Sequence, residues 1–200
     1  SSPSRGLGDV YKRQAIKGPL KGRMLEDMPS EQMSLESWLA KYPDSLVLQY
    51  DPTFQKQYAI RTALLNYEVS LPGWHMQASP PLVVGVEVSG VARAYDWNEL
   101  VKRQFVEDDA GGMPLLVVTD AEGDSAFVYN RTVDGTALTF KKTKAGIEDT
   151  NTGSSWDCFG RCLKGKLKGK TLTQQQSYKQ YVRAWVTFHP DASFYDFQTA

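Results

Sequence analysis

The sequence has few of the residues on which metal and thiol chemistry depends. Its 200 residues include two cysteines and two histidines, too few for a disulfide scaffold, and no histidine lies near the cysteines to complete a zinc ligand set. We interpret His75, in the GWHMQ stretch, as a packing residue rather than a copper ligand beside Met76. His189 is interpreted as a helix-end residue that interacts with the helix dipole. We therefore expect no metal site and no cofactor.

The chain also lacks an excess of charge and long apolar runs. Lys and Arg together number 23, as do Asp and Glu, so the positive excess typical of nucleic-acid or anionic membrane binding is missing. The longest apolar runs, such as PLVV at 81–84 and LLVV at 115–118, have the length of strands and not of membrane-spanning helices. The sequence predicts a globular chain with no nucleic-acid partner and no membrane span in its visible part.

The first 14 residues, SSPSRGLGDVYKRQ, show neither apolar periodicity nor a helix cap signal. One reading frame of a transposon end used in sequencing-library preparation encodes residues 9–14. We interpret residues 1–14 as translated adapter on a truncated metagenomic fragment; the alternative is a genuine basic, Ser- and Gly-rich arm. On the first interpretation the true start is missing and the compartment stays open, with export to the periplasm or cell surface as one candidate.

A long internal repeat is the strongest feature of the sequence. The stretch IKGPLKGRMLEDMPSEQMSLESWLAKYPD, from residue 16, aligns without a gap to LKGKLKGKTLTQQQSYKQYVRAWVTFHPD, from residue 163. In both stretches two glycines flank an apolar residue, which predicts a tight turn. Apolar residues then recur at helical spacing up to a Pro-Asp pair. The period exceeds that of solenoid units, so it indicates duplication of a whole domain.

The repeat divides the chain into four predicted parts. Residues 15–50 are expected to be the closing segment of a truncated upstream repeat, and residues 81–200 a complete repeat domain. Residues 51–80 are predicted to connect them through a helix and a linker, and residues 1–14 to be disordered. We expect the complete domain to contact its own upstream repeat.

Within residues 81–200 the pattern predicts an α+β fold built mainly of antiparallel β-sheet. PLVVGVEVSGVARAYDW alternates on either side of Ser89-Gly90, as β-hairpins do, and WNELVKRQF offers a short helix after this first hairpin. MPLLVVTDAEGDSAFVYNRTVDGTALTFKK gives three strand-like runs, two of which are separated by the tight turn at Asp134-Gly135. A closing amphipathic helix completes the domain.

Four segments together resemble the bacterial domain-of-unknown-function family 3179: VGVEVSGVARAYDWNELV, RTVDGTALTF, DTNTGSSWDCFGRCLKGKLKGKTL and WVTFHPD. Typical members carry a Trp-His-Glu and a Tyr-Cys-Pro-Leu element, a pair suited to metal binding or nucleophilic chemistry. This sequence has Asn98 in place of the histidine and Asp120 near the position of the cysteine. Asparagine is no general base, and one carboxylate does not replace a thiolate. The resemblance therefore implies a domain that has lost such chemistry.

The candidate site residues share a place in, or near, the elements that carry the resemblance. They are Asn98, Glu99, Asp120, Arg131, Asp149, Thr152, Ser154 and Trp156. For Cys158 and Cys162, in CFGRC, three interpretations stay open: a disulfide, a metal or redox role, and two unlinked core thiols. The acidic stretch at 107–112 is interpreted as a solvated turn rather than a Ca²⁺ site, and KGKLKGK as a solvated lysine face rather than an anion site.

Two functions remain open from the sequence. It favours a non-catalytic binding or interaction domain of a duplicated bacterial protein, because the repeat is present and the histidine and cysteine elements are not. The alternative is an enzyme, or a metal- or thiol-dependent protein, whose active residues lie in the missing upstream copy. For this fragment the sequence favours the absence of catalysis, and it leaves ligand, partners and oligomeric state open.

Overall fold

The structure is a computed structural model that describes residues 15, 17–24, 30–46, 48, 51–60, 81–143 and 146–198. The chain divides into two compact units, residues 1–30 and residues 31–200. The described part of the first unit contains the turn at 17–24, and all the elements named below belong to the second. None of the helices in the described ranges is long and apolar enough to cross a membrane.

The second unit opens with two short helical elements, α2 (Leu35–Lys41) and the 3-10 helix η1 (Pro52–Phe54). A β-rich domain follows from residue 82. Its elements, in chain order, are β1 (Leu82–Val88), β2 (Val91–Asp96), α4 (Trp97–Arg103), β3 (Phe105–Ala110), β4 (Met113–Thr119), β5 (Ala126–Asn130), β6 (Thr132–Val133), β7 (Thr136–Ala137), β8 (Phe140–Thr143), β9 (Gly146–Asp149), β10 (Ser155–Trp156), β11 (Cys162–Lys164), β12 (Thr173–Gln175), β13 (Ser177–Tyr181), α5 (Val182–Phe188) and β14 (Ser193–Phe194).

The strands of the domain form three four-stranded sheets and one two-stranded ribbon. The strand orders are β13-β1-β2-β14, β12-β5-β4-β3 and β11-β10-β9-β8, with β6-β7 as the ribbon. Neighbouring strands pair antiparallel except β14, which pairs parallel to β2. The helix α4 follows the β1–β2 hairpin and α5 follows β13. These features confirm the predicted α+β fold with mainly antiparallel sheets, a helix after the first hairpin and a closing helix.

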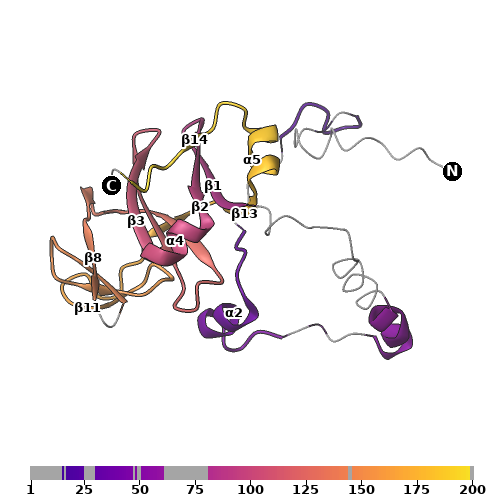
Figure 1. The fold of residues 1–200 in the computed structure, drawn as a ribbon, viewed down its shortest axis with the longest axis horizontal. Helices are drawn as coiled ribbons and strands as arrows, with labels where there is room; N and C mark the ends of the chain where they lie inside the picture. The colour runs from indigo at the N-terminus through magenta and orange to yellow at the C-terminus, as the bar shows by residue number, and fades with distance from the viewer. Residues whose placement is uncertain are drawn as a thin grey trace. The chain divides into compact units, whose positions relative to one another are not determined.

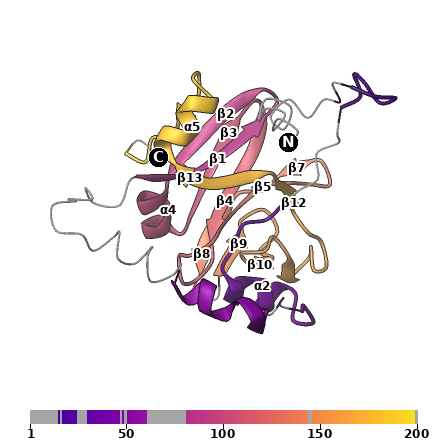
Figure 2. The same cartoon turned by 90° about the vertical axis from the view of Figure 1, so that its right-hand side faces the viewer.

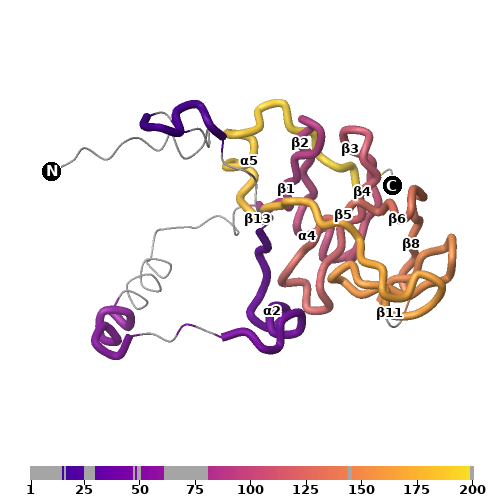
Figure 3. Tube along the Cα trace, turned by 180° about the vertical axis from the view of Figure 1, so that it is seen from behind, coloured from indigo at the N-terminus to yellow at the C-terminus, as the bar shows by residue number. Residues whose placement is uncertain are grey.

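The sheet of β3, β4 and β5 lies between the other two, and β4 supplies residues to both interfaces. Leu115 and Val117 pack with the apolar residues of β1 and β2, whereas Leu116 and Val118 pack with those of β8–β10. Successive side chains of a strand point to opposite faces, so the continuous apolar run of β4 serves two cores. Figures 1 and 3 show this order, from α5 through β1 and β3 to β8 and β11.

The closing helix α5 covers the outer face of the β1–β2 hairpin through one tryptophan. Trp185 is fully buried among Val83, Ala94 and neighbouring apolar residues. Its indole lies against Gly85, where an added Cβ would stand 2.4 Å from the ring. Glycine is therefore the residue that lets the helix approach the strand this closely.

The two sequence stretches that align with each other also share their local backbone. The turn at 17–24 is closed by the Ala15 N–H, which donates to the Arg23 carbonyl at 2.9 Å. The later turn is closed in the same way, by a bond of 2.9 Å from Cys162 to Lys170. The helices that follow, α2 and α5, each span 7 residues, and each ends at a cap residue with φ −131° and ψ 73°.

The strands β12 and β13 are consecutive in the chain and belong to different sheets. β12 pairs with β5, and β13, which begins after the single residue Gln176, pairs with β1. One extended run of the chain therefore borders two sheets and leads into α5.

Candidate functional site

The loop at residues 120–125 joins β4 to β5 and holds a buried carboxylate. Asp120 is 6% exposed. Its Oδ1 accepts hydrogen bonds from the N–H groups of Asp124, at 2.8 Å, and Ser125, at 3.1 Å, and its own N–H donates to the Ser125 carbonyl at 3.0 Å. Bonds of this kind are typical of Asp-centred turns. They fix the carboxylate at the end of β4 and leave Oδ2 for a partner from outside the loop.

That partner comes from α2, far away in the sequence. The Ser37 hydroxyl donates to Asp120 Oδ2 at 2.6 Å, and both side chains are buried. One turn earlier, the Ser34 N–H donates to the Ser125 hydroxyl at 2.9 Å. Ser34 is also the N-cap of α2, where its hydroxyl accepts from the Ser37 N–H at 3.2 Å. The first turn of α2 is therefore bonded to the loop at two points.

A charged pair extends this contact over two aromatic rings. The Lys41 ammonium forms an ion pair with Glu31, and each of these side chains is only 13% exposed. The same ammonium lies 6.0 Å from the ring centroid of Phe127 and 5.8 Å from that of Phe159. The two rings pack edge to face, 5.6 Å apart. The last turn of α2 thus lies over the aromatic core beside the loop, with its cation paired and facing the rings.

The hydrogen bonds of the loop favour the deprotonated form of the Asp120 carboxyl, which accepts hydrogen bonds. Burial alone would raise the pKa of this carboxyl, but the hydrogen bonds from Ser37, Ser125 and Asp124 outweigh burial and lower the pKa below its ordinary value. The group is charged at neutral pH, and its oxygens are engaged by donors of the protein itself. This arrangement suits the holding of a donor-bearing segment and not proton transfer.

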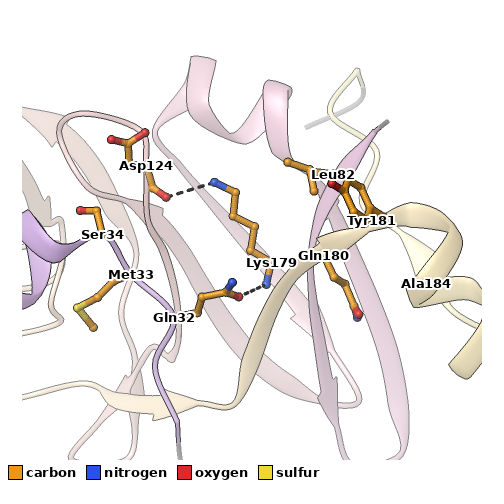
Figure 4. A pocket seen from close by; sticks show the side chains of 9 residues that line it. All are labelled: Gln32, Met33, Ser34, Leu82, Asp124, Lys179, Gln180, Tyr181 and Ala184. Carbon is orange, nitrogen blue, oxygen red and sulfur yellow. Dashed lines mark hydrogen bonds between the residues drawn. The ribbon is translucent and has the colours of Figure 1, made fainter. Parts of the chain in front are cut away.

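On one side the loop borders a cavity of about 530 Å³, which Figure 4 shows. Lys179 reaches across it from β13 and donates to the Asp124 carbonyl at 3.2 Å, while the Lys179 N–H donates to Gln32 Oε1 at 3.3 Å. The ammonium lies 3.4 Å from the ring centroid of Trp97, the first residue of α4. Desolvation lowers the pKa of Lys179. Lys179 of β13 thus contacts three other parts of the chain, which are the loop, the segment before α2 and α4.

Asn98 and Glu99 follow that tryptophan on α4 and line neither of the two cavities described here. Asn98 is exposed. The Glu99 N–H donates to the Asp96 carboxylate at 3.0 Å, which caps the helix, and the Glu99 side chain pairs with Lys102 on the surface. The structure thus separates the exposed Asn98 from the buried Asp120 cluster.

On its other side Asp120 borders a second cavity, of about 500 Å³, at the ends of β4, β8 and β9. Asp120, Asp157 and Cys158 line it together with apolar residues of β3, β4 and β9 and with polar side chains that include Lys142. Burial raises the pKa of the Cys158 thiol to about 11, and the nearby Asp157 and Asp120 charges add to the effect. The thiol is protonated at neutral pH, so it is a weak nucleophile and a weak metal ligand.

Both cysteines are free thiols in the structure. Cys162 is buried in the core, and its Sγ lies 3.4 Å from the Lys164 carbonyl. Cys158 is half-buried, and its carbonyl accepts from the Tyr129 hydroxyl at 3.1 Å. The two sulfurs are not bonded to each other in the structure, and the disulfide considered from the sequence stays a prediction.

Four of the candidate residues come together as a buried hydrogen-bond network. The fully buried Asp149 carboxylate accepts from the Thr152 N–H at 2.6 Å, the Ser154 N–H at 3.2 Å and the Trp156 indole N–H at 2.9 Å. Burial would raise the pKa of Asp149, but these bonds lower it. The network fixes the turn after β9 and anchors the indole of Trp156 in the core, and none of its members lines either cavity.

Arg131 lies apart from the Asp120 loop, next to β6. Its guanidinium donates to the Leu138 carbonyl at 2.7 Å and lies 3.4 Å from the Asp109 carboxylate. The Nε atom is buried without a hydrogen-bond partner in the described ranges. Arg131 thus links β3 to the segment after β7 and lines neither of the two cavities described here.

The remaining polar candidates are engaged in contacts between elements. The acidic stretch 107–112 is not a solvated turn as interpreted from the sequence, because it belongs to β3 up to Ala110 and pairs with β4. Within it, Asp108 accepts from the Arg93 guanidinium at 2.6 Å and from the Tyr95 hydroxyl at 3.0 Å. His189 stacks on the indole of Trp185, with ring centroids 3.8 Å apart. His75 lies outside the described residues. Within the part of the chain that the structure describes, no group of three or more His, Cys, Asp or Glu side chains is placed to hold a metal ion.

Sequence reasoning missed the residues that join α2 to the loop, namely Ser34, Ser37 and Lys179. A serine directly before an apolar run of helical spacing is a helix N-cap signal, so the sequence could have identified Ser34, which precedes Leu35. The Ser37–Asp120 bond joins residues 83 positions apart, and a single sequence carries no local signal for a partner at that distance.

Comparison with known proteins assigns the chain to a family. No curated protein and no solved structure shows a significant match. One family model matches continuously over residues 9–192. The match begins inside the stretch that we interpret as adapter, and that interpretation stays a prediction. Since the matched range covers most of the 200 residues, the chain belongs to the family described as Protein of unknown function (DUF3179).

Proposed function

We propose that residues 81–198 form a non-catalytic binding domain, and that its Asp120 loop binds the closing segment of a preceding repeat, represented in this chain by residues 30–46. The observation that carries this proposal is the bond of 2.6 Å between the Ser37 hydroxyl and Asp120 Oδ2. It places a donor from the N-terminal segment on a carboxylate that the loop has already oriented.

Assignment of residues 30–46 to a preceding repeat is supported by backbone and sequence together. The turns at 17–24 and 164–171 close with equivalent hydrogen bonds, and the helices α2 and α5 have the same length and the same cap angles. Both helices carry a tryptophan at their fourth position and a Pro-Asp pair after their ends. Duplication of a domain accounts for all of these with one event.

Binding, in preference to catalysis, is supported by the state of the ionisable groups around the loop. Asp120 is charged and surrounded by donors, and the pKa of Cys158 is raised to about 11. A catalytic acid, base or thiolate needs a pKa near the working pH and access to a substrate. A lowered carboxyl pKa suits an anchoring contact instead, and a protonated thiol is a weak nucleophile.

The contact with α2 contributes binding free energy and fixes the position of the helix on the loop. A hydrogen bond to a charged acceptor contributes about 1.5–3 kcal/mol, and the Ser37–Asp120 bond is of this kind. The Ser34–Ser125 bond and the placement of Lys41 over Phe127 fix the two ends of the helix. An ordered segment of this size loses conformational entropy on docking, so the buried charge-assisted bond is expected to decide whether α2 stays seated.

The proposal is tested by hydrogen exchange on the full chain. We expect Ser37→Ala to raise the exchange rate of the α2 amides by about 10- to 100-fold, which corresponds to the loss of about 1.5–3 kcal/mol. The amides of β1 and β4 should keep their protection, because the domain itself is not altered.

Ser45→Ala is the matched control. Ser45 accepts a hydrogen bond from the Trp38 indole at 2.8 Å on the exposed side of the segment, so this variant makes the same chemical change without touching the loop. Equal exchange of α2 in both variants and the parent chain would mean that the contact does not hold the segment, and the proposal would fail. Turnover of a small molecule by the purified chain would also overturn it.

A further inference from the structure

The side of α2 that faces away from the Asp120 loop is apolar and exposed. Leu35 is 57% exposed, Trp38 38%, Leu39 39% and Tyr42 41%. Their positions follow the i, i+3, i+4, i+7 spacing of one helix face. Trp38 and Tyr42 contact each other, with ring centroids 4.8 Å apart, and their polar atoms bond to Ser45 and Glu31 of the same segment. The face has the composition of a core surface without a sheet against it.

The same face is buried in the equivalent helix. In α5 the residue equivalent to Trp38 is Trp185, which is fully buried, and the equivalents of Leu35 and Tyr42, Val182 and His189, are half-buried. Val186, the equivalent of Leu39, is 36% exposed, so the burial of this face in α5 is centred on the tryptophan. The indole of Trp185 enters the space above Gly85 on β1. Two helices with the same length, the same C-terminal cap angles and the same tryptophan position therefore differ in whether a β1–β2 hairpin covers that tryptophan.

The geometry points to a committed partner for the exposed face. We propose that Leu35, Trp38, Leu39 and Tyr42 dock on the β1–β2 sheet of another domain of this same fold, with the Trp38 indole over the glycine equivalent to Gly85. This inference rests on the proposed origin of α2 in a preceding repeat. A second copy of this chain is the less suitable partner, because α5 already covers its β1–β2 hairpin.

The contacts on the two sides of α2 are compatible with each other. Consecutive residues of an α-helix are about 100° apart around its axis, so Ser37 and Trp38 face different directions. Ser37 and Lys41 contact the Asp120 loop and the aromatic rings beside it, and the tryptophan side stays open. The surface we propose is thus continuous with a contact that the structure already contains, and α2 would lie between two successive domains. Figure 2 shows α2 and α5 at opposite ends of the described domain. Each of the two helices can therefore contact a different neighbouring domain.

A graft in the full chain tests whether this face fits the sheet. The seven residues of α5, VRAWVTF at 182–188, are replaced by the seven of α2, LESWLAK. We expect the grafted chain to fold, with an unfolding equilibrium constant in urea within about 30-fold of the parent, since volume-preserving exchange of apolar residues costs under about 1.5 kcal/mol and the flanking changes add little. Its Trp185 fluorescence should remain that of a buried indole.

The control graft has the same composition with two letters exchanged, LEWSLAK. This order moves the indole away from Gly85 by one position around the helix. We expect it to raise the unfolding constant by more than about 100-fold, the lower end of what loss of a buried tryptophan costs. Equal stability of the two grafts, or failure of the LESWLAK graft to fold, would overturn the inference.

The solution state of the unmodified chain gives an independent check. If the chain forms a dimer that Trp38→Ala converts to a monomer, the exposed face pairs with a second copy and the inference is wrong. If the chain is a monomer and Trp38→Ala leaves its sedimentation coefficient unchanged, the result agrees with a face that only a preceding domain covers. Both measurements leave the Asp120 loop untouched, so their failure is distinguishable from a failure of the hydrogen-exchange test on Ser37.

Discussion

The two equivalent tryptophans offer the sharpest test of the packing described above. Trp185 is fully buried between α5 and β1, whereas Trp38, at the same place in α2, is 38% exposed. Removing a buried tryptophan costs about 3–5 kcal/mol, a large share of the total of about 5–15 kcal/mol that stabilises a domain. We therefore expect Trp185→Ala to lower the free energy of unfolding by about 3–5 kcal/mol, and Trp38→Ala by less than about 1 kcal/mol.

A third variant separates the apolar contact from the indole N–H. The Nε1 atom of Trp185 is buried, and the described residues provide no hydrogen-bond partner for it. A buried donor without a partner costs about 1–3 kcal/mol, which offsets part of what the ring contributes. Trp185→Phe removes that donor and keeps an aromatic ring over Gly85, so we expect it to lose less than about 1.5 kcal/mol.

Urea unfolding followed by circular dichroism measures all three variants on the full chain. The order of stability should be parent, Trp38→Ala, Trp185→Phe, Trp185→Ala, with the first three close together. The reasoning fails if Trp38→Ala destabilises the chain as much as Trp185→Ala, because a residue that is 38% exposed has less buried surface to lose than a fully buried one. It also fails if Trp185→Phe is as damaging as Trp185→Ala.

The remaining predictions concern the turns and the ionisable groups. Asp149→Asn should lower the free energy of unfolding, measured in urea at pH 7, by at least about 3 kcal/mol, because an uncharged amide would replace the carboxylate to which buried donors bond. The lowered pKa of Asp149 contributes stability that is present above the unfolded value of about 3.9 and is lost as pH falls through the folded value, so the stability of the parent should fall more steeply below about pH 4 than that of Asp149→Asn. Gly165→Ala should be more destabilising than Gly169→Ala, although both have positive φ, because only the former would place a Cβ 2.6 Å from Ser154; equal losses would show that φ alone matters. Cys158 should react slowly with iodoacetamide at pH 7 and faster as pH rises toward 11, since burial raises its pKa; fast alkylation at pH 7 would contradict that burial.

Local sequence patterns predicted several of the elements, missed the strand β3 in the acidic stretch that we interpreted as a turn, and were insufficient for the long-range contacts. The alternation around Ser89-Gly90 predicted the β1–β2 hairpin, and the Asp134-Gly135 pair predicted the tight turn between β6 and β7, because each depends on neighbouring residues alone. The division into three sheets was not predicted. It depends on β4 having two buried faces, and a continuous apolar run does not say which strands cover it.

The candidate site shows the same division between local and distant information. The Asp149, Thr152, Ser154 and Trp156 group was nominated as a possible pocket because it lies in one stretch of the family resemblance, and the structure places it in a buried hydrogen-bond network that lines neither of the two cavities described above. Asp120 was nominated through a family resemblance, yet its partner Ser37 was not, since the contact joins residues 83 positions apart. Polar residues that a motif brings together can stabilise the fold as readily as they can bind a ligand. Only their burial and their hydrogen-bond partners distinguish the two roles.

The passage of the chain from β12 to β13 has a consequence for how the domain opens. These two strands are separated by one residue and pair with β5 and β1, in different sheets. Pulling one sheet apart therefore strains the border of the other within a few residues, so the two sheets should not exchange their amides as separate units. Native-state hydrogen exchange should show β1 and β5 opening in a single cooperative event, and the mechanical resistance of the domain should lie in this short stretch of chain.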